Sequence, residues 1–104
     1  SDSIVRVLHD RDHYSALIVA WGSMAAKTLY HTNRMKISVP EELAVISLAG
    51  DSSARFTYPR LSTCELPLYD LGVKSAQILT DNINKAGMPV STLLPCVLNI
   101  QDSC

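Results

Sequence analysis

Two short apolar runs separated by a segment of helix length constrain the fold more than any other feature of the sequence. The runs are Ala16–Ala20 and Leu43–Leu48, and turn-forming residues bound both of them. A short apolar run between turn residues is typical of a strand buried on both faces of a parallel sheet. From Ser23, a favourable N-cap residue, small and apolar residues recur at helical spacing to about Asn33. The order strand, helix, strand therefore predicts a βαβ unit, in which the two strands are parallel.

The remaining elements fit around the second run, which we expect to be the central strand. Ser1–Asp12 has the apolar spacing of the end of an amphipathic helix, so we expect the chain to be part of a longer one. Further along, the pattern predicts a short strand over Leu61–Leu66 and a helix over Leu68–Lys85. A last strand over Leu93–Ile100 contains Pro95, which favours an edge position. The predicted fold class is α/β, a parallel sheet flanked by helices.

Composition excludes several classes of protein. The net charge of −1 shows no excess of basic residues of the kind that binds nucleic acid or an anionic membrane. No apolar stretch approaches the roughly 18 residues of a membrane span, and no basic-then-apolar leader opens the chain. Cys64, Cys96 and Cys104 lack the spacing of a metal or redox site. We expect a reduced, cytoplasmic compartment, and neither a cofactor nor a metal.

The candidate ligand site is the edge of the sheet where the two predicted strands end. Ligands of open α/β sheets bind beyond the carboxyl ends of the strands, and the loops after the two runs begin there. The predicted lining residues are Trp21, Gly22, Ala49, Gly50 and Asp51. Trp21 could stack on a planar ligand or on the apolar face of a sugar. The alternative is that Trp21 covers the end of the sheet or lies in an interface.

No catalytic constellation accompanies this edge, so we do not expect an enzyme. The three histidines, His9, His13 and His31, fall outside both loops. Asp51 is the only carboxylate there, whereas general acid–base catalysis usually needs a partner with a perturbed pKa. The segment around Ser23 lacks the second glycine of a nucleophile elbow.

Taken in order, a series of short motifs resembles the C-terminal part of the effector-binding core of lactose-repressor/galactose-repressor (LacI/GalR) family transcription regulators. The motifs are Met24-Ala25, Val39-Pro40-Glu41-Glu42-Leu43-Ala44-Val45-Ile46, Pro59, Leu61-Ser62-Thr63, Pro67, Leu71-Gly72, Ala76, Leu79, Leu94-Pro95 and Asp102-Ser103-Cys104. The resemblance implies one lobe of a periplasmic-binding-protein-like (type I) fold that closes on effectors such as sugars or nucleosides. It also implies that a DNA-binding head and most of the other lobe lie outside residues 1–104.

Two departures from the family concern the candidate site. Where the family usually has Asn-Asp after the first strand this sequence has Trp21-Gly22, and where it has Asp-Asp after the second this sequence has Ala49-Gly50. Asp51, one place later, substitutes in part. Because the family's acidic residues bind polar effectors, these departures suggest a less polar ligand, a weaker one or none.

The resemblance leaves three functions to compare. The leading one is the ligand-sensing and dimerisation region of a cytoplasmic transcription regulator. The second is a secreted sugar-binding component of a transport system with the same fold, and the third is an α/β enzyme domain. For the first we expect a homodimer that pairs through Ile37, Phe56 and Tyr58, because large apolar residues in irregular segments are usually covered. The apolar stripe of Leu68–Lys85 must also be covered, by its own sheet or by another copy.

Overall fold

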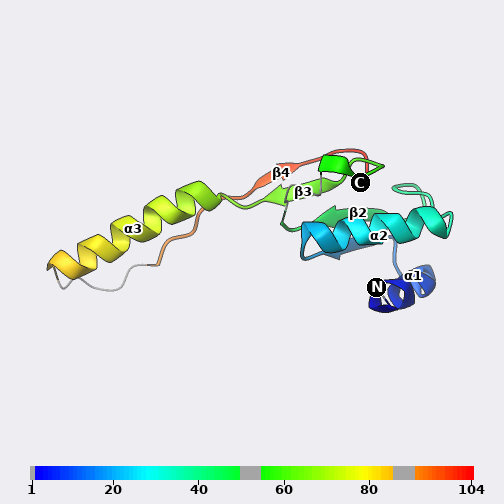
Figure 1. The fold of residues 1–104 in the computed structure, drawn as a ribbon, viewed down its shortest axis with the longest axis horizontal. Helices are drawn as coiled ribbons and strands as arrows, with labels where there is room; N and C mark the ends of the chain where they lie inside the picture. Colours follow the sequence, from blue (N-terminus) through cyan, green and yellow to red (C-terminus); the bar gives the residue numbers. More distant parts are fainter. Residues whose placement is uncertain (1, 50–54, 86–90) are drawn as a thin grey trace. The chain divides into compact units, whose positions relative to one another are not determined.

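The computed structural model describes residues 2–49, 55–85 and 91–104 (Figure 1). The chain forms two compact units, one made of Ser1–Glu65 and Leu98–Cys104 and the other of Leu66–Val97. The described elements are α1 (Asp2–His9), the 3-10 helix η1 (Arg11–His13), β1 (Ala16–Val19), α2 (Gly22–Arg34), β2 (Ala44–Ser47), β3 (Ser62–Glu65), α3 (Leu68–Lys85) and β4 (Val97–Asn99).

The predicted βαβ unit is confirmed. The four strands form one sheet in the order β1-β2-β3-β4, so β2 is an inner strand as expected. β1 and β2 run parallel, with Ala16 opposite Ala44 and Val19 opposite Ser47. β3 runs parallel to β2 on its other side. β4 is the edge strand expected from the proline, and it begins only at Val97, after Pro95.

The hydrophobic core of the first unit lies between this sheet and the two helices α1 and α2. α2 contacts β1 and β2, and α1 contacts α2 (Figure 1). The buried apolar residues are Leu8, Val19, Ala25, Leu29, Ile37, Leu43, Val45 and Leu61. Along β2 the burial alternates, with Val45 and Ser47 fully buried and Ala44 and Ile46 half-buried. Such alternation is typical of a strand that packs mainly with one face.

The expectation that β1 is buried on both faces is wrong for this chain. Its side chains alternate, and Val19 is buried while Ile18 is 65% exposed. The apolar run predicted a strand correctly, but the degree of burial depends on what packs on each face of the sheet. In the first unit, α2 packs on the Val19 side.

The end of α2 explains the position of Ile37. The Ile37 N–H donates to the Thr32 carbonyl at 2.9 Å and the Lys36 N–H donates to the Asn33 carbonyl at 3.2 Å. These two bonds define a Schellman motif, in which the residue after the helix is left-handed; here Lys36 has φ 57°. The motif turns the chain back, and the apolar residue that follows packs onto the helix. Ile37 is accordingly 5% exposed and part of the core.

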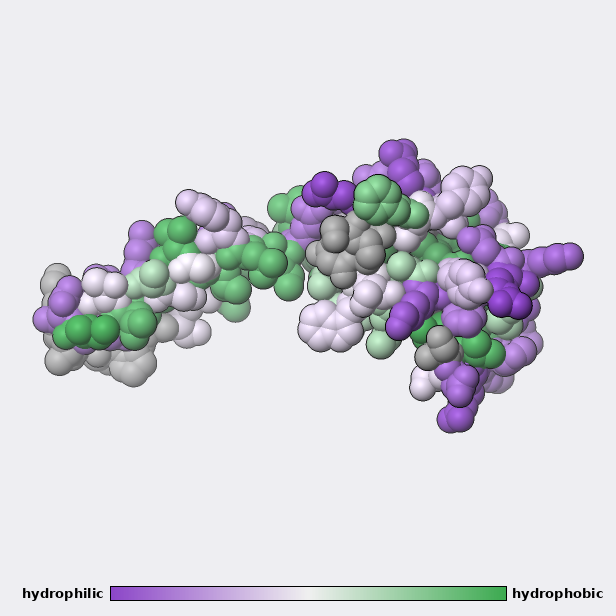
Figure 2. All heavy atoms as spheres, viewed as in Figure 1, coloured by the Kyte–Doolittle hydropathy of each residue, from purple (hydrophilic) through white to green (hydrophobic). Residues whose placement is uncertain are grey.

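The second unit consists mainly of α3, which has the bounds that the sequence predicts. The Leu71 N–H donates to the Pro67 carbonyl at 2.8 Å, so the helix starts directly after the proline. Its apolar stripe is largely exposed: Leu68, Leu71, Leu79 and Ile83 each keep at least 48% of their surface, and Ile78 is half-buried. Figure 2 shows hydrophobic residues at the surface of this unit. The prediction that the stripe must be covered therefore remains a prediction.

Candidate functional site

The two loops of the candidate site begin side by side, as predicted from the strand-end rule. Val19 and Ser47 are paired at the carboxyl ends of β1 and β2. The Leu48 N–H, directly after β2, donates to the Val19 carbonyl at 2.8 Å and holds the starts of the two loops together. We call residues 20–22 and 48–49 the rim. Gly50 and Asp51, which the sequence also places at this edge, lie outside the described residues.

Trp21 occupies the start of α2. Its backbone is extended, with φ −126° and ψ 144°, and its carbonyl accepts the first bond of the helix from the Ala25 N–H at 2.9 Å. Trp21 is therefore the N-cap residue, and the expectation that Ser23 has that role is wrong. The residue is 61% exposed, whereas the neighbouring Gly22 is buried. This arrangement fixes the backbone of Trp21 and leaves much of its side chain free to contact a ligand.

The second loop contributes a short polar turn. The Ser47 hydroxyl donates to the Ala49 carbonyl at 2.7 Å, and Ser47 is completely buried. Ala49 is half-buried, and Leu48 beside it is 49% exposed. The described rim thus carries apolar side chains and no charged one. A surface of this kind favours contact with an apolar or aromatic face of a ligand over recognition of many hydroxyl groups.

Among the residues that the structure describes, Tyr14 and Arg34 have shifted pKa values, and both lie away from the rim. Burial raises the pKa of the Tyr14 phenol, and the Asp10 carboxylate adds to this effect while Arg11 opposes it. A hydrogen bond to the Tyr30 hydroxyl raises the pKa of Arg34, near the end of α2. Within residues 2–49, 55–85 and 91–104, no three His, Cys, Asp or Glu side chains are grouped so as to hold a metal ion.

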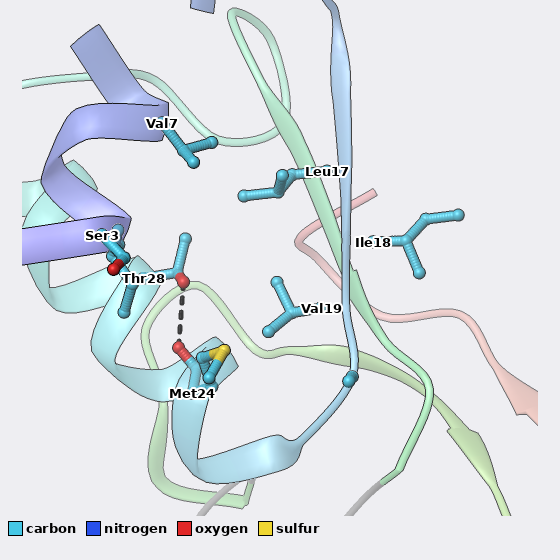
Figure 3. Close-up of a pocket in the computed structure, with 9 residues that line it drawn as sticks. Ser3, Val7, Leu17, Ile18, Val19, Met24 and Thr28 are labelled. Atoms are coloured by element: carbon cyan, nitrogen blue, oxygen red, sulfur yellow. Dashed lines mark hydrogen bonds between the residues drawn. The ribbon is translucent and has the colours of Figure 1, made fainter. Parts of the chain in front are cut away.

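A cavity of about 190 Å³ lies on the helix-covered side of β1. Figure 3 shows Leu17 and Val19 pointing into this space, whereas Ile18, which also borders it, points away on the other side of β1. The lining residues are Ser3, Ile4, Val7, Leu17, Ile18, Val19, Ala20, Met24 and Thr28. The Thr28 hydroxyl already donates to the Met24 carbonyl at 2.9 Å. This apolar lining does not suit a hydroxyl-rich ligand. Ala20 of the rim belongs to the lining, whereas the predicted site residues Trp21, Gly22 and Ala49 do not.

The predicted dimer surface is corrected at one position. Ile37 is part of the core, so it has little surface to offer a partner, and its assignment to a dimer interface is wrong. Phe56 and Tyr58 are 87% and 84% exposed. The Asn33 side-chain amide donates to the Tyr58 carbonyl at 3.1 Å, which joins this loop to α2.

Sequence reasoning missed two further residues of this surface, Tyr30 and Arg34. Tyr30 is 55% exposed, and the Arg34 guanidinium lies 5.8 Å from the centre of its ring. Their spacing of four residues on a predicted helix is the signal that points to them, because such residues lie on one helix face. We call Tyr30, Arg34, Phe56 and Tyr58 the aromatic surface.

A mainly parallel sheet with helices, and with loops that begin side by side at the strand ends, is the architecture of an open α/β protein. The sequence model of the family described as "Periplasmic binding protein-like domain" matches residues 3–104, and the chain belongs to this family. Among the described residues, no helix has both the length and the apolar content needed to cross a membrane.

Several proteins similar to this chain are transcription regulators. The HTH-type transcriptional repressor MelR of Bacillus subtilis is 28% identical over 96 residues, which make up 91% of this chain and 28% of MelR. A LacI family regulator from Arthrobacter sp. FB24, solved in complex with lactose, is 25% identical with a TM-score of 0.81, covering 98% of this chain and 39% of that one. The regulator GntR from Chromobacterium violaceum is 29% identical with a TM-score of 0.82, and the match covers 98% of this chain and 38% of that one. The resemblance to LacI/GalR regulators is therefore confirmed, and the chain spans less than a third of MelR.

Proposed function

We propose that residues 1–104 belong to the ligand-sensing and dimerisation region of a LacI/GalR-type transcription regulator that acts in the cytoplasm. The observation that carries this proposal is the similarity of 91% of the chain to a transcriptional repressor. The relatives named above are regulators and not enzymes or transport proteins, which favours this function over the alternative of a sugar-binding transport component. DNA would be bound through a head domain outside residues 1–104.

The rest of the effector-binding core would also lie outside these residues. The chain spans 28% of the length of MelR, so a protein of that size would contain much more polypeptide. The exposed stripe of α3 supports this part of the proposal. Burial of a leucine or isoleucine side chain contributes roughly 1.5–3 kcal/mol, so a further lobe that covers the stripe would add substantially to stability.

The effector would be a small molecule that presents an apolar face, such as the face of a sugar ring, to Trp21. An exposed indole beside an uncharged rim is suited to stacking on such a face. Gly22, Ala49, Gly50 and Asp51 complete the proposed site, with Asp51 as the group that would accept hydrogen bonds from ligand hydroxyls. The complex of the Arthrobacter regulator with lactose is consistent with an effector of this class.

Trp21 is the only tryptophan of the chain, so its fluorescence reports on the rim directly. A titration of the full-length protein with a panel of mono- and disaccharides, including lactose, tests the proposal, with any tryptophan elsewhere in that protein replaced by phenylalanine. We expect a saturable change in emission with at least one sugar. If no sugar changes the emission and calorimetry detects no binding, the proposed effector class is wrong.

The homodimer would pair through the aromatic surface. Aromatic residues and arginine are enriched at interfaces. Arg34 lies over the ring of Tyr30, and the Asn33 bond to the Tyr58 carbonyl holds the loop with the exposed Phe56 and Tyr58 against the same helix. A two-fold interface brings the same patch of each copy together, so a charge placed there is repeated on both sides.

The double variant Phe56→Glu, Tyr58→Glu should therefore be monomeric in light scattering of the full-length protein. Tyr69→Glu on α3 is the matched control, because Tyr69 is 83% exposed and belongs to the other unit, and it should leave the dimer intact. A dimer that persists in the double variant would exclude the aromatic surface as the interface.

A further inference from the structure

Ser103 is completely buried between β2 and β3, near the end of the chain. Its hydroxyl donates to the Val45 carbonyl at 2.5 Å and accepts from the Ser62 N–H at 2.8 Å. Its backbone is bonded in both directions as well. The Val45 N–H donates to the Ser103 carbonyl at 2.8 Å, and the Ser103 N–H donates to the Arg60 carbonyl at 3.0 Å.

These bonds replace a step of the β2–β3 ladder. The register places Ile46 opposite Ser62, and a direct parallel ladder would then bond Val45 to Arg60 and to Ser62. In the structure each of these two connections passes through Ser103. One uses the backbone of Ser103, and the other uses its hydroxyl. Ser103 thus lies where the two strands would otherwise meet.

The neighbouring residues hold this insertion in place. The Gln101 N–H donates to the Ser62 hydroxyl at 2.8 Å, and the Asp102 N–H donates to the Arg60 carbonyl at 3.0 Å. The Arg60 guanidinium also pairs with the Asp102 carboxylate at 3.2 Å, although both side chains are exposed and the pair contributes little. Ser103 is the member of this group whose loss would leave buried backbone groups without partners.

We propose that residues 101–103 act as a strap that attaches β3 to β2, and that the Ser103 hydroxyl is its essential group. Among the described residues, the register pairs β2 with β3 at Ile46–Ser62 and Ser47–Thr63, whereas β1 and β2 pair at every position from Ala16 to Val19. β3 therefore depends on the strap for much of its attachment. This inference concerns the fold and does not depend on the proposed function.

The requirement for a hydroxyl follows from its two simultaneous bonds. One group must donate to the Val45 carbonyl and accept from the Ser62 N–H in a space closed to water. A methyl group can do neither, so an alanine would leave one buried donor and one buried acceptor without this partner. The backbone bond from Val45 to Ser103 would persist in such a variant.

Amide hydrogen exchange measured by NMR on Ser103→Ala tests the proposal. Loss of the Ser103 hydroxyl, which accepts from the Ser62 N–H, should speed hydrogen exchange of the Ser62 amide by about tenfold to a hundredfold. The Ala44 and Leu48 amides, which bond to Ser15 and Val19 on the β1 side, should be unchanged. The matched control is Ser75→Ala, because the Ser75 hydroxyl donates to the Leu71 carbonyl at 2.7 Å at an exposed site. Unchanged exchange at Ser62 would overturn the proposal.

A second variant keeps the test decisive if Ser103→Ala does not fold. Ser62→Ala removes only the acceptor of the Gln101 N–H and leaves both bonds of the Ser103 hydroxyl intact. Exchange of the Gln101 amide should then rise while that of the Ser62 amide stays slow. A Gln101 amide that exchanges at the wild-type rate would show that the strap is not held as proposed and would contradict the inference.

Discussion

Replacing Leu29 by alanine should destabilise the 104-residue chain far more than the same replacement of Leu79. Leu29 lies on α2 and is 1% exposed, among the core residues under the sheet. Truncation of a buried leucine costs about 2–5 kcal/mol, because transfer free energy is lost and a cavity remains. Leu79 on α3 is 62% exposed, so its truncation should change the free energy of unfolding by no more than about 0.5 kcal/mol.

Urea unfolding followed by circular dichroism measures the difference. With a slope of about 1.5 kcal/mol per M, a loss of about 3 kcal/mol lowers the midpoint by about 2 M. For a domain whose whole stability is about 5–15 kcal/mol, such a shift is easily resolved. Equal costs for Leu29→Ala and Leu79→Ala would refute the reasoning, because Leu79 would then be buried in solution. In a full-length protein whose other lobe covers α3, Leu79→Ala should become as costly as Leu29→Ala.

Two further predictions follow from local geometry. Lys36→Gly should stabilise the chain by up to about 1 kcal/mol, measured by the same urea assay, because φ 57° suits glycine and strains other residues; a loss of stability would contradict this account of the end of α2. Absorbance near 295 nm should show one of the four tyrosines titrating above the ordinary value of 10, and Tyr14→Phe should remove that component. Since the raised pKa belongs to the folded state, unfolding releases the proton more readily, and the stability contributed by Tyr14 should fall as the pH rises above about 10. A titration curve that Tyr14→Phe leaves unchanged in shape would contradict this assignment.

The sequence predicted helices and strands correctly where a local pattern of residues is compatible with one kind of secondary structure. The apolar runs Ala16–Ala20 and Leu43–Leu48 could only be strands, since each is too short for a buried helix and is bounded by turn residues. Pro67 determined the start of α3 because a proline is tolerated only in the first turn of a helix or before it. The strand-end rule then brought the loops that contain Trp21 and Ala49 together, since it depends only on the parallel pairing of β1 and β2.

The errors arose where the outcome depended on contacts distant in sequence or on an uncommon backbone conformation. The sequence places Ile37 on a surface, whereas the left-handed turn at Lys36 folds it into the core. A lysine gives no signal of such a turn, because this conformation is usual for glycine. Exposure of Ile18 depends on what packs on each face of the sheet, which no local pattern records. The role of Ser103 depends on Val45, 58 positions away, and nothing in the residues around a serine reveals such a partner.

Calorimetric titration of the full-length protein and its Trp21→Ala variant with the effector is the most direct test of a ligand site at the strand-end rim. Loss of a ring stacked on a ligand should cost about 1 kcal/mol or more, which weakens binding about fivefold or more. Tyr69→Ala, which removes another exposed aromatic side chain, on α3, should leave the affinity unchanged. We predict weaker binding for Trp21→Ala alone. Equal affinities for the wild type and Trp21→Ala would contradict the assignment of the effector site to the rim.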